Sequence, residues 1–497
     1  MTLASLLAEV ETTAVTGPTD REISDLCLDS RRVAPGAVFF GLAGAREDGG
    51  RYAAQAVAAG AAAVVVARGT TVAGTTVVEV EEPRRALAQA AARFHGHPER
   101  ALRVIGVTGT NGKTTTTWML EAIFAAAGLK AGVIGTTGVR LAGEPRPATL
   151  TTPEAPALFG LLREMVARGV AAVAIEVSSH ALVQRRAYGL ACEVAVFTNL
   201  SHDHLDYHAT MERYLDAKLM LFDGRNLDRG GAGGRAWTAV VNADDAVADR
   251  VAEAARRGGA ALATYGGGEG VRFRIEAVAP QPRGLSFALR HEGRVTQVAL
   301  PLLGRHNAWN AAAAFAAAAA MGIGPKTACT GLAGMPAVPG RLEPVEAGQP
   351  FGVVVDYAHT PDALGRALAA AREHGGGRVL LVFGCGGDRD RGKRPVMGKV
   401  AAQGSDRAWV TSDNPRREDP AAIAADIVAG AEAGAFTVEL DRRAAIVAAL
   451  AAARPGDTVL IAGKGHETTQ TLGECQLPFD DREVAREALR AQAAGRR

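Results

Sequence analysis

The sequence predicts an α/β protein of three domains, and three observations support this prediction. The chain has 497 residues, which is too many for one ordinary hydrophobic core. Short apolar runs that are typical of buried strands alternate with stretches that are typical of helices. In the last third of the chain each such strand ends in a polar loop, which indicates a parallel, doubly wound sheet whose ligands lie at the carboxyl ends of the strands.

The predicted elements divide the chain into three blocks. Residues 1–100 contain the apolar strands "GAVFFGL" and "AAAVVVA" and end in a charged helix, "EPRRALAQAAARFHGHPER". Residues 101–335 open with the buried-strand pattern "LRVIGV" and continue through "AAVAIEV", "EVAVFTNL" and "TAVVNADD". Their run "AAAAFAAAAAM" is too short to span a bilayer and is typical of a helix packed inside a domain. Residues 336–497 supply "FGVVVDYAHTPDAL", "RVLLVFGCGGDRD", "RAWVTSDNPRRED" and "DTVLIAGKGHET".

The composition is that of a soluble globular protein, with 48% hydrophobic and 22% charged residues. A formal net charge of +2 gives no electrostatic argument for nucleic acid or for an anionic membrane. The five cysteines are widely spaced without a C-x-x-C pair, which fits a reducing compartment and argues against a disulfide framework. Because no basic segment followed by an apolar core opens the sequence, we expect no signal peptide and a cytoplasmic protein.

The most specific signal is the stretch "VIGVTGTNGKTTTT", in which a strand runs into a glycine-rich loop and then a helix. Backbone N–H groups of such a loop close around phosphate oxygens at a helix N-terminus. Lys113 can reach the β- and γ-phosphates, and the Thr114 hydroxyl can coordinate Mg²⁺. Val107 stands where the usual motif has its first glycine, so a chance glycine-rich turn is the alternative. The residues expected to contact the nucleotide are Gly109, Thr110, Asn111, Gly112, Lys113, Thr114 and Thr115.

Candidate metal-binding residues follow two later strands. Glu176 ends the strand in "AIEVSSHAL", where it is either a Mg²⁺ ligand or an ordinary loop acid. Lys218 has the neighbours Ala217 and Leu219, and the simplest interpretation is a lysine that extends its amine from a helix into solvent. The stretch "TNLSHDHLDYH" holds five polar side chains of which at least one is expected to be functional and the others solvated, namely His202, Asp203, His204, Asp206 and His208.

Several motifs in a fixed order together resemble the Mur ligases, the cytoplasmic enzymes of peptidoglycan precursor synthesis. They are "GTNGKTTT", "EVSSHAL", "TNLSHDHLDYH" with "AKLMLF", "GRHNAWNAAAA", "DYAHTPDAL", "FGCGGDRDRGKRP", "DNPR" and "GKGHE". The segment "LDSRRVAPGAVFFGLAG" is also similar to the family, so the resemblance covers nearly the whole chain. It implies a UDP-sugar-binding domain at 1–100, a central P-loop ATPase domain with a mostly parallel sheet at 101–335, and a Rossmann-like amino-acid-binding domain at 336–497.

The resemblance also implies roles around the nucleotide. Lys113 and Thr114 would hold ATP and Mg²⁺, with Glu176 on the first metal ion. His204 would bind a second Mg²⁺, and Lys218 would be carbamylated, which converts a cation that repels Mg²⁺ into an anion that binds it. Asn307 and Asn310 would contact adenine, with helix capping as the alternative. Arg341, Asp356 and a catalytic His359 would close over the nucleotide, with a plain loop histidine as the alternative for the last.

Two further groups of residues resemble substrate contacts of the family. The nucleotide-sugar dipeptide would be held by Ser30, Thr151, Thr152, Ser178, Gln184 and Arg186, although the two threonines also suit a loop before a helix. The incoming amino acid would be held by Arg389, Asp413, Asn414, Pro415, Arg416, Gly463 and Glu467. The Arg416 guanidinium can pair with the second carboxylate of diaminopimelate, a group that lysine lacks. Arg417 and Glu418 are predicted to be solvated loop residues.

The activity that the resemblance implies is ATP-dependent amide formation, in which meso-2,6-diaminopimelate is added to UDP-N-acetylmuramoyl-L-alanyl-D-glutamate through an acyl phosphate. The expected partners are these small molecules, with no nucleic acid and no membrane, and the enzyme is expected to be a monomer. Three alternatives stay open at this point. They are a ligase for L-lysine or another diamine, a P-loop NTPase that acts as a switch or motor, and a UDP-sugar-binding protein without catalysis.

Overall fold

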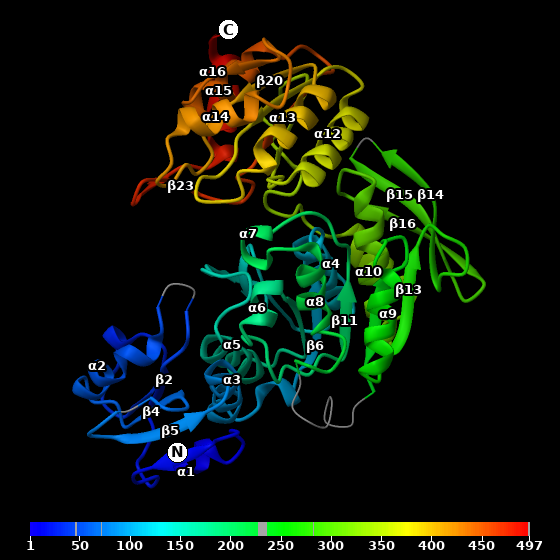
Figure 1. The fold of residues 1–497 in the computed structure, drawn as a ribbon. Coiled ribbons are helices and arrows are strands. Elements are labelled where there is room, and N and C mark those ends of the chain that lie inside the picture. The colour runs from blue at the N-terminus through cyan, green and yellow to red at the C-terminus, as the bar shows by residue number, and fades with distance from the viewer. Residues whose placement is uncertain (45–46, 71, 227–235, 282, 496–497) are drawn as a thin grey trace.

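A computed structural model describes residues 1–44, 47–70, 72–226, 236–281 and 283–495. Three large β-sheets organise the described chain, beside a small two-stranded one, and each large sheet lies within one of the three predicted blocks (Figure 1). The predicted three-part α/β architecture is therefore confirmed. The domain boundaries after residues 100 and 335 stay predictions. The strands of the first sheet end at Val80, and those of the second begin at Arg103.

The first block forms a five-stranded sheet in the order β1-β5-β4-β3-β2, which is parallel except for β1. Its strands are β1 (Ala14–Thr16), β2 (Asp25–Cys27), β3 (Ala37–Phe40), β4 (Ala63–Ala67) and β5 (Thr76–Val80). Its helices are α1 (Leu3–Leu7), α2 (Ala53–Ala58) and α3 (Pro83–Phe94), with 3-10 turns at Ser30–Arg32, Gly49–Tyr52 and Pro98–Arg100. The expected charged helix is α3, which turns an alanine-rich face inward.

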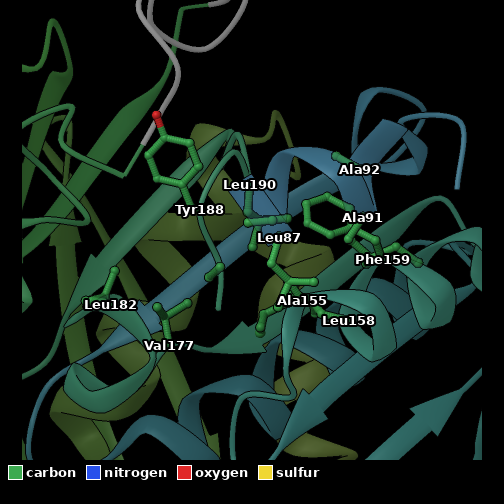
Figure 2. Close-up of a cluster of buried hydrophobic side chains, with 14 of the residues drawn as sticks. Leu87, Ala91, Ala92, Ala155, Leu158, Phe159, Val177, Leu182, Tyr188 and Leu190 are labelled. Carbon is green, nitrogen blue, oxygen red and sulfur yellow. The ribbon is translucent and has the colours of Figure 1, made fainter. Parts of the chain in front are cut away.

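Helix α3 also joins the first block to the second. Leu87, Ala91 and Ala92 of α3 lie in one hydrophobic cluster with Leu158 and Phe159 of α5 (Figure 2). Burying this shared apolar surface stabilises the contact between the two blocks.

The second block forms an eleven-stranded sheet in the order β16-β15-β14-β13-β12-β11-β6-β10-β7-β8-β9. Its strands are β6 (Arg103–Thr108), β7 (Ala131–Gly135), β8 (Gly138–Leu141), β9 (Glu144–Arg146), β10 (Ala172–Glu176), β11 (Val194–Phe197), β12 (Thr238–Asn242), β13 (Ala261–Gly266), β14 (Phe273–Gln281), β15 (Gly284–His291) and β16 (Arg294–Leu300). The run from β14 to β7 is parallel, whereas antiparallel hairpins extend both edges. The sheet is mostly parallel, as predicted.

Helices cover both faces of this sheet because its central strands are apolar on both sides. They are α4 (Lys113–Ala126), α5 (Ala155–Ala167), α6 (Ser179–Val183), α7 (Leu205–His208), α8 (Met211–Leu219), α9 (Ala248–Arg257), α10 (His306–Ala320) and α11 (Pro325–Ala333). The alanine-rich run falls in α10, whose small side chains are buried against α4, which confirms the packed-helix prediction.

The third block forms a six-stranded sheet in the order β17-β18-β22-β19-β20-β21, parallel except for β17. Its strands are β17 (Glu343–Pro344), β18 (Gly352–Asp356), β19 (Val379–Phe383), β20 (Arg407–Val410), β21 (Phe436–Val438) and β22 (Thr458–Ala462), beside a hairpin of β23 (Thr469–Leu472) and β24 (Cys475–Pro478). Its helices are α12 (Pro361–Gly375), α13 (Lys393–Gly404), α14 (Pro420–Val428), α15 (Arg442–Ala452) and α16 (Asp481–Gly495). One core lies under α12, α13 and α14 and another under α15 and α16, so the sheet is doubly wound.

All five cysteines are free. None of the helices in the described ranges combines the length and the apolar character that crossing a bilayer requires.

Candidate active site

The glycine-rich loop joins β6 to α4, which confirms the predicted strand–loop–helix arrangement. Gly109 has a φ of 145°, and a side chain there would lie 1.9 Å from the Thr198 hydroxyl oxygen, so only glycine fits. The Lys113 ammonium donates to the backbone oxygens of Gly109 (2.9 Å) and Thr110 (2.7 Å), which holds it across the mouth of the loop. Burial lowers the pKa of Lys113. A polyanion at this loop would meet backbone N–H groups, a helix N-terminus and a partly buried amine.

Glu176 lies at the end of β10 directly beside the loop, with 1% of its surface exposed. Its Oε2 accepts hydrogen bonds from the hydroxyls of Thr114 (3.1 Å) and Thr136 (3.0 Å), and its Oε1 accepts one from the Thr136 backbone N–H (2.8 Å). A carboxylate and a hydroxyl placed side by side at a phosphate loop are the hard oxygen donors that Mg²⁺ prefers. The geometry therefore fits the predicted metal-binding pair and contradicts an ordinary, solvated loop acid.

Lys218 is buried in α8, with 1% of its surface exposed, so the interpretation as a lysine extending into solvent is wrong. Its ammonium lies 4.2 Å from the centre of the Tyr214 ring. Burial, reinforced by the positive charge of Lys113, holds the pKa of Lys218 well below its usual value. The residue is therefore a buried amine close to the phosphate loop, in surroundings that disfavour its charged form.

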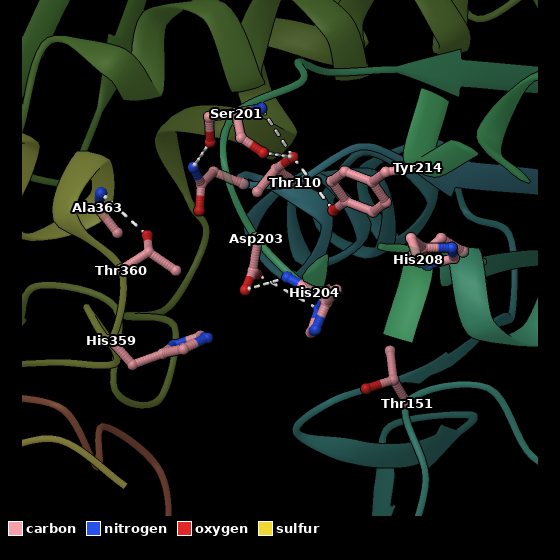
Figure 3. A network of polar contacts seen from close by, with 12 residues as sticks. Thr110, Thr151, Ser201, Asp203, His204, His208, Tyr214, His359, Thr360 and Ala363 are labelled. Carbon is pink, nitrogen blue, oxygen red and sulfur yellow. Dashed lines mark hydrogen bonds and ion pairs between the residues drawn. The ribbon is translucent and has the colours of Figure 1, made fainter. Parts of the chain in front are cut away.

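The histidine-rich stretch contains exposed, partly buried and fully buried side chains, and His204 is partly buried. His204 has its Nε2 3.3 Å from Asp203, and burial lowers its pKa to about 3. His208 is buried with its Nε2 2.9 Å from the Ser179 hydroxyl, so it is not a solvated loop residue. His202 and Asp206 are exposed as predicted, although Asp206 belongs to helix α7 and not to a loop. Figure 3 shows Asp203 and His204 facing the same space as His359, which comes from the third block.

Within the described residues, no three His, Cys, Asp or Glu side chains form a ready-made metal cage. Glu176 and His204 could each contribute a single ligand, with substrate phosphate oxygens and water filling the other positions, which is a common way to bind Mg²⁺. Neutral imidazole is the form of histidine that binds metals, and the lowered pKa of His204 keeps it neutral.

A cavity of about 480 Å³ opens from the phosphate loop toward α10 and the third block, and it is large enough for a nucleotide. Asn307 and Asn310 line it from within α10, where neither side chain caps the helix. The Asn310 Nδ2 donates to the Asn307 Oδ1 (2.8 Å), and the Asn307 Nδ2 donates to the Leu303 backbone oxygen (2.7 Å). The capping alternative is therefore wrong for both residues.

The third block closes one side of this cavity. Arg341 donates from Nη2 to the Thr114 hydroxyl (3.1 Å), so it reaches the phosphate loop directly. Asp356 accepts from the Leu342 backbone N–H (2.8 Å), and burial raises its pKa to about 6. His359 has its Nδ1 2.9 Å from the Tyr357 backbone oxygen, and burial lowers its pKa.

The residues predicted to hold the nucleotide-sugar dipeptide fall into two places. The Thr152 hydroxyl donates to the Glu176 backbone oxygen (2.7 Å) and accepts from the Ser178 backbone N–H (3.1 Å), which connects this group to the backbone of the predicted metal ligand. The hydroxyl oxygens of Thr151 and Thr136 lie 3.1 Å apart, within hydrogen-bonding distance. Arg186 donates to the Gln184 side-chain oxygen (2.6 Å) and pairs with Glu154 (3.0 Å). Ser30 belongs to the first sheet block, where its hydroxyl donates to Gln55 (2.9 Å).

The residues predicted to hold the amino acid gather at the carboxyl edge of the third sheet. Asp413, Asn414 and Pro415 are buried, and burial raises the pKa of Asp413. The Asn414 Nδ2 donates to the Glu467 carboxylate (2.7 Å). Gly463 has a φ of 115° and would place a side chain 2.4 Å from the Asp413 carboxylate, so glycine is required here.

Arg416 is half-buried at a φ of 53°, a left-handed conformation that is uncommon for arginine and typical of functional loops. Its Nη1 donates to the Gly387 backbone oxygen (2.7 Å). Burial lowers its pKa, and the nearby charge of Arg389 adds to the effect. Arg389 itself is exposed. Two guanidinium groups thus flank a site that also contains the carboxylates of Asp413 and Glu467.

One sequence prediction at this site was wrong. Glu418 is not solvated, because its carboxylate accepts hydrogen bonds from Arg394 (2.9 Å) and Arg391 (2.8 Å). These bonds, with Arg394 first, lower the pKa of Glu418 to about 2. Arg417 is exposed as predicted and pairs with Asp388.

Three fully buried charged side chains beneath these loops were not predicted from the sequence. Lys464 donates to the Thr469 backbone oxygen (2.6 Å), the Glu467 carboxylate (3.1 Å) and the Asn414 side-chain oxygen (3.2 Å). Arg442 pairs with Asp481, and neither side chain is exposed. The only sequence signal for Lys464 is its place inside "GKGHE".

Comparison with known proteins agrees with this geometry. Models of the Mur ligase family match three stretches of the chain, the family's catalytic domain at residues 22–95, its middle domain at 107–318 and its glutamate ligase domain at 340–465. The UDP-N-acetylmuramoyl-L-alanyl-D-glutamate–2,6-diaminopimelate ligase of Solibacter usitatus is 43% identical over 496 residues, covering 99% of this chain and 98% of that protein. The ligase of the same name from Geobacillus thermodenitrificans is 44% identical over 473 residues, covering 94% and 95%.

Solved structures give the same result. The structure of a ligase with that name is 34% identical, with a TM-score of 0.69 and 99% coverage of both chains. The MurF ligase of Thermotoga maritima in complex with ADP is 19% identical with a TM-score of 0.62, and it shares the fold. This chain belongs to the Mur ligase family. Within the family it is similar along nearly its whole length to the enzymes named for 2,6-diaminopimelate.

Proposed function

We propose that this protein is an ATP-dependent amide ligase that joins meso-2,6-diaminopimelate to UDP-N-acetylmuramoyl-L-alanyl-D-glutamate in peptidoglycan precursor synthesis. The observation that carries the proposal is the combination of two sites in one chain. A phosphate loop with Glu176 beside Thr114 lies at the carboxyl ends of the central strands of the middle sheet. A loop of mostly buried residues that ends in Arg416 lies at the carboxyl edge of the third sheet, the block from which Arg341 reaches the phosphate loop.

The nucleotide site suits ATP. Lys113 and the loop N–H groups bind the phosphates, Asn307 and Asn310 present amide groups to adenine, and Arg341 reaches in from the third block. Thr114, Glu176 and His204 are the residues that would hold Mg²⁺, which neutralises phosphate charge when bound. Lys218 is the proposed carbamylation site, because its burial favours the uncharged form of the amine. That form can add to CO₂ to form an N–C bond and a carbamate anion with loss of one proton.

The chemistry has two steps. A carboxylate oxygen of the dipeptide attacks the γ-phosphorus of ATP, and the bond between this phosphorus and the bridging oxygen of the β-phosphate breaks. ADP departs, and the dipeptide becomes an acyl phosphate. The amine of diaminopimelate then attacks the acyl carbon, and the amide forms as phosphate leaves and the amine gives up its proton. Lys113, Arg341 and His359 would hold the reacting groups and oppose the developing negative charge.

The amino-acid site favours diaminopimelate over lysine. Both amino acids carry a distal ammonium, but diaminopimelate also carries a distal carboxylate that the Arg416 fork can bind. Lysine would leave that half-buried guanidinium without an anionic partner, which costs binding energy. Asp413, Asn414 and Glu467 supply acceptors for ammonium groups.

We further propose that the enzyme acts in the cytoplasm as a monomer on these small molecules, with domains that divide near residues 100 and 335. Its five free cysteines suit a reducing compartment.

The test is ADP release measured with the nucleotide-sugar dipeptide, with and without meso-diaminopimelate or L-lysine. We expect rapid ADP release only when the dipeptide and meso-diaminopimelate are both present. Turnover of the dipeptide with L-lysine but not with meso-diaminopimelate would make lysine the substrate. ATP hydrolysis that needs neither the dipeptide nor an amino acid would contradict the ligase proposal.

A further inference from the structure

Beneath the amino-acid loops lies an ion pair that the proposed reaction does not use. Arg442 is the first residue of α15, and Asp481 is the first residue of α16. The arginine donates from Nε to Oδ1 (2.8 Å) and from Nη2 to Oδ2 (2.7 Å), and neither side chain has any exposed surface. Desolvating two charges is expensive, and a hydrophobic pair of similar volume often stabilises a fold as well. Stability alone is therefore a weak reason for this pair.

The remaining donors of Arg442 bind the backbone at the base of two substrate loops. Nη2 donates to the Ala462 oxygen (2.9 Å), and a longer contact joins Nη1 to the Ser412 oxygen (3.4 Å). Ala462 immediately precedes Gly463, and Ser412 immediately precedes Asp413. These loops follow β22 and β20, which are not neighbours, because β19 lies between them. One guanidinium thus spans two loops across an intervening strand.

The two loops meet closely on the ligand side. Asp413 packs so tightly against Gly463 that a side chain on the glycine would lie 2.4 Å from the carboxylate. A small change in the spacing of the loops would therefore displace the Asp413 carboxylate. Arg442 is also the charge that most strongly opposes the rise that burial causes in the pKa of Asp413. The guanidinium supports both the position and the negative charge of that carboxylate.

We propose that Arg442 is a positioning residue for the amino-acid substrate, which fixes the spacing between the Asp413 and Gly463 loops, with Asp481 holding its guanidinium in place. The inference rests on the proposed function, because it assumes that these loops bind diaminopimelate. Arg442 does not touch the ligand and acts through the loop backbone and Asp413.

Two variants separate positioning from stability. Arg442→Lys keeps the positive charge but loses the planar fork that reaches both carbonyls. The double variant Arg442→Met with Asp481→Leu replaces the pair by apolar side chains of similar volume, which preserves packing. For both we expect the KM for diaminopimelate to rise by about 10- to 100-fold, the scale that a small misplacement of a bound substrate produces. The KM values for ATP and for the nucleotide-sugar dipeptide should stay within about twofold, since those sites lie on other elements.

The matched control is Arg378→Met. Arg378 also pairs with an aspartate, Asp457 (2.6 Å), and also donates to a backbone oxygen, that of Ala452 (3.1 Å). It lies at the opposite, amino-terminal end of the same strands. We expect this variant to lower the thermal midpoint without changing the KM for diaminopimelate.

The outcomes are distinguishable. A double variant that folds, as judged by circular dichroism, and keeps the wild-type KM for diaminopimelate would overturn the positioning role. Equal losses for all three substrates would also overturn it, because they would indicate a general structural role. If instead the wild-type enzyme forms no product with diaminopimelate, the proposed function fails before the variants are compared.

Discussion

Removal of the Arg416 side chain tests the specificity of the amino-acid site. The guanidinium is half-buried and uses Nη1 for the Gly387 oxygen, which leaves other N–H donors for a substrate carboxylate. Truncating one partner of a buried charge pair costs about 2–5 kcal/mol, and partial exposure places Arg416→Ala at the lower end. A loss of about 2–3 kcal/mol corresponds to a decrease of roughly 30- to 150-fold in kcat/KM for meso-diaminopimelate.

The loop itself should survive the substitution. Its backbone is held by the β23–β24 hairpin, because the Arg416 N–H donates to the Thr471 oxygen (3.1 Å) and the Gly473 N–H donates to the Arg416 oxygen (2.7 Å). Alanine carries the same Cβ into the same left-handed conformation, so the backbone strain changes little.

The assay is initial-rate kinetics with meso-diaminopimelate and with L-lysine at saturating ATP and dipeptide. The preference for diaminopimelate over lysine should shrink in Arg416→Ala, and Arg416→Lys should recover only part of it because an ammonium cannot form a bidentate pair. The control is Arg417→Ala, which removes an exposed neighbour whose partner, Asp388, lies at the surface. Unchanged selectivity in Arg416→Ala would refute the assignment.

Three further predictions concern other parts of the molecule. Lys218→Arg keeps a long basic side chain but cannot be carbamylated, so kcat should fall by about 100-fold or more while the Kd for ATP, measured by calorimetry, changes little. A near-normal kcat would exclude a role for the modification. Asn310→Leu should raise the Kd for ATP by about tenfold because it removes an amide from the cavity, and an unchanged Kd in the same titration would remove Asn310 from the adenine site. Glu418→Gln should lower the urea midpoint at pH 7, because hydrogen bonds from Arg394 depress the folded-state pKa of Glu418 to about 2 from its ordinary 4.5. That stabilisation is present above pH 4.5 and is lost as the pH falls toward 2, so wild type and variant should converge in acid, and a constant difference would contradict this linkage.

The sequence was most informative where chemistry is encoded by neighbouring residues. The phosphate loop could be predicted because its strand, glycines, lysine and threonine are contiguous. The loop that ends in Arg416 could be placed at a ligand-facing edge because carboxyl ends of parallel strands share one edge of a sheet. Lys218 needed the fold, since its local pattern fits an exposed helix lysine equally well.

The misses depend on distant partners. Glu418 looked solvated because the arginine that buries it, Arg394, lies 24 residues earlier on α13. Arg442 and Asp481 are 39 residues apart and meet only because α15 and α16 pack on the same face of the third sheet. The antiparallel hairpins that extend both edges of the middle sheet were not foreseen either, since strand pairing is a long-range property.

The most direct test of the central claim follows the oxygen of the reacting carboxylate. The purified enzyme is given ATP, meso-diaminopimelate and the nucleotide-sugar dipeptide, which is labelled with ¹⁸O in its free glutamyl side-chain carboxylate. The masses of the released phosphate and of the product are then measured by mass spectrometry. An acyl phosphate predicts that the released phosphate carries one ¹⁸O and that the product has the mass of both substrates less one labelled water. Unlabelled phosphate, or ADP without the amide product, would contradict the account.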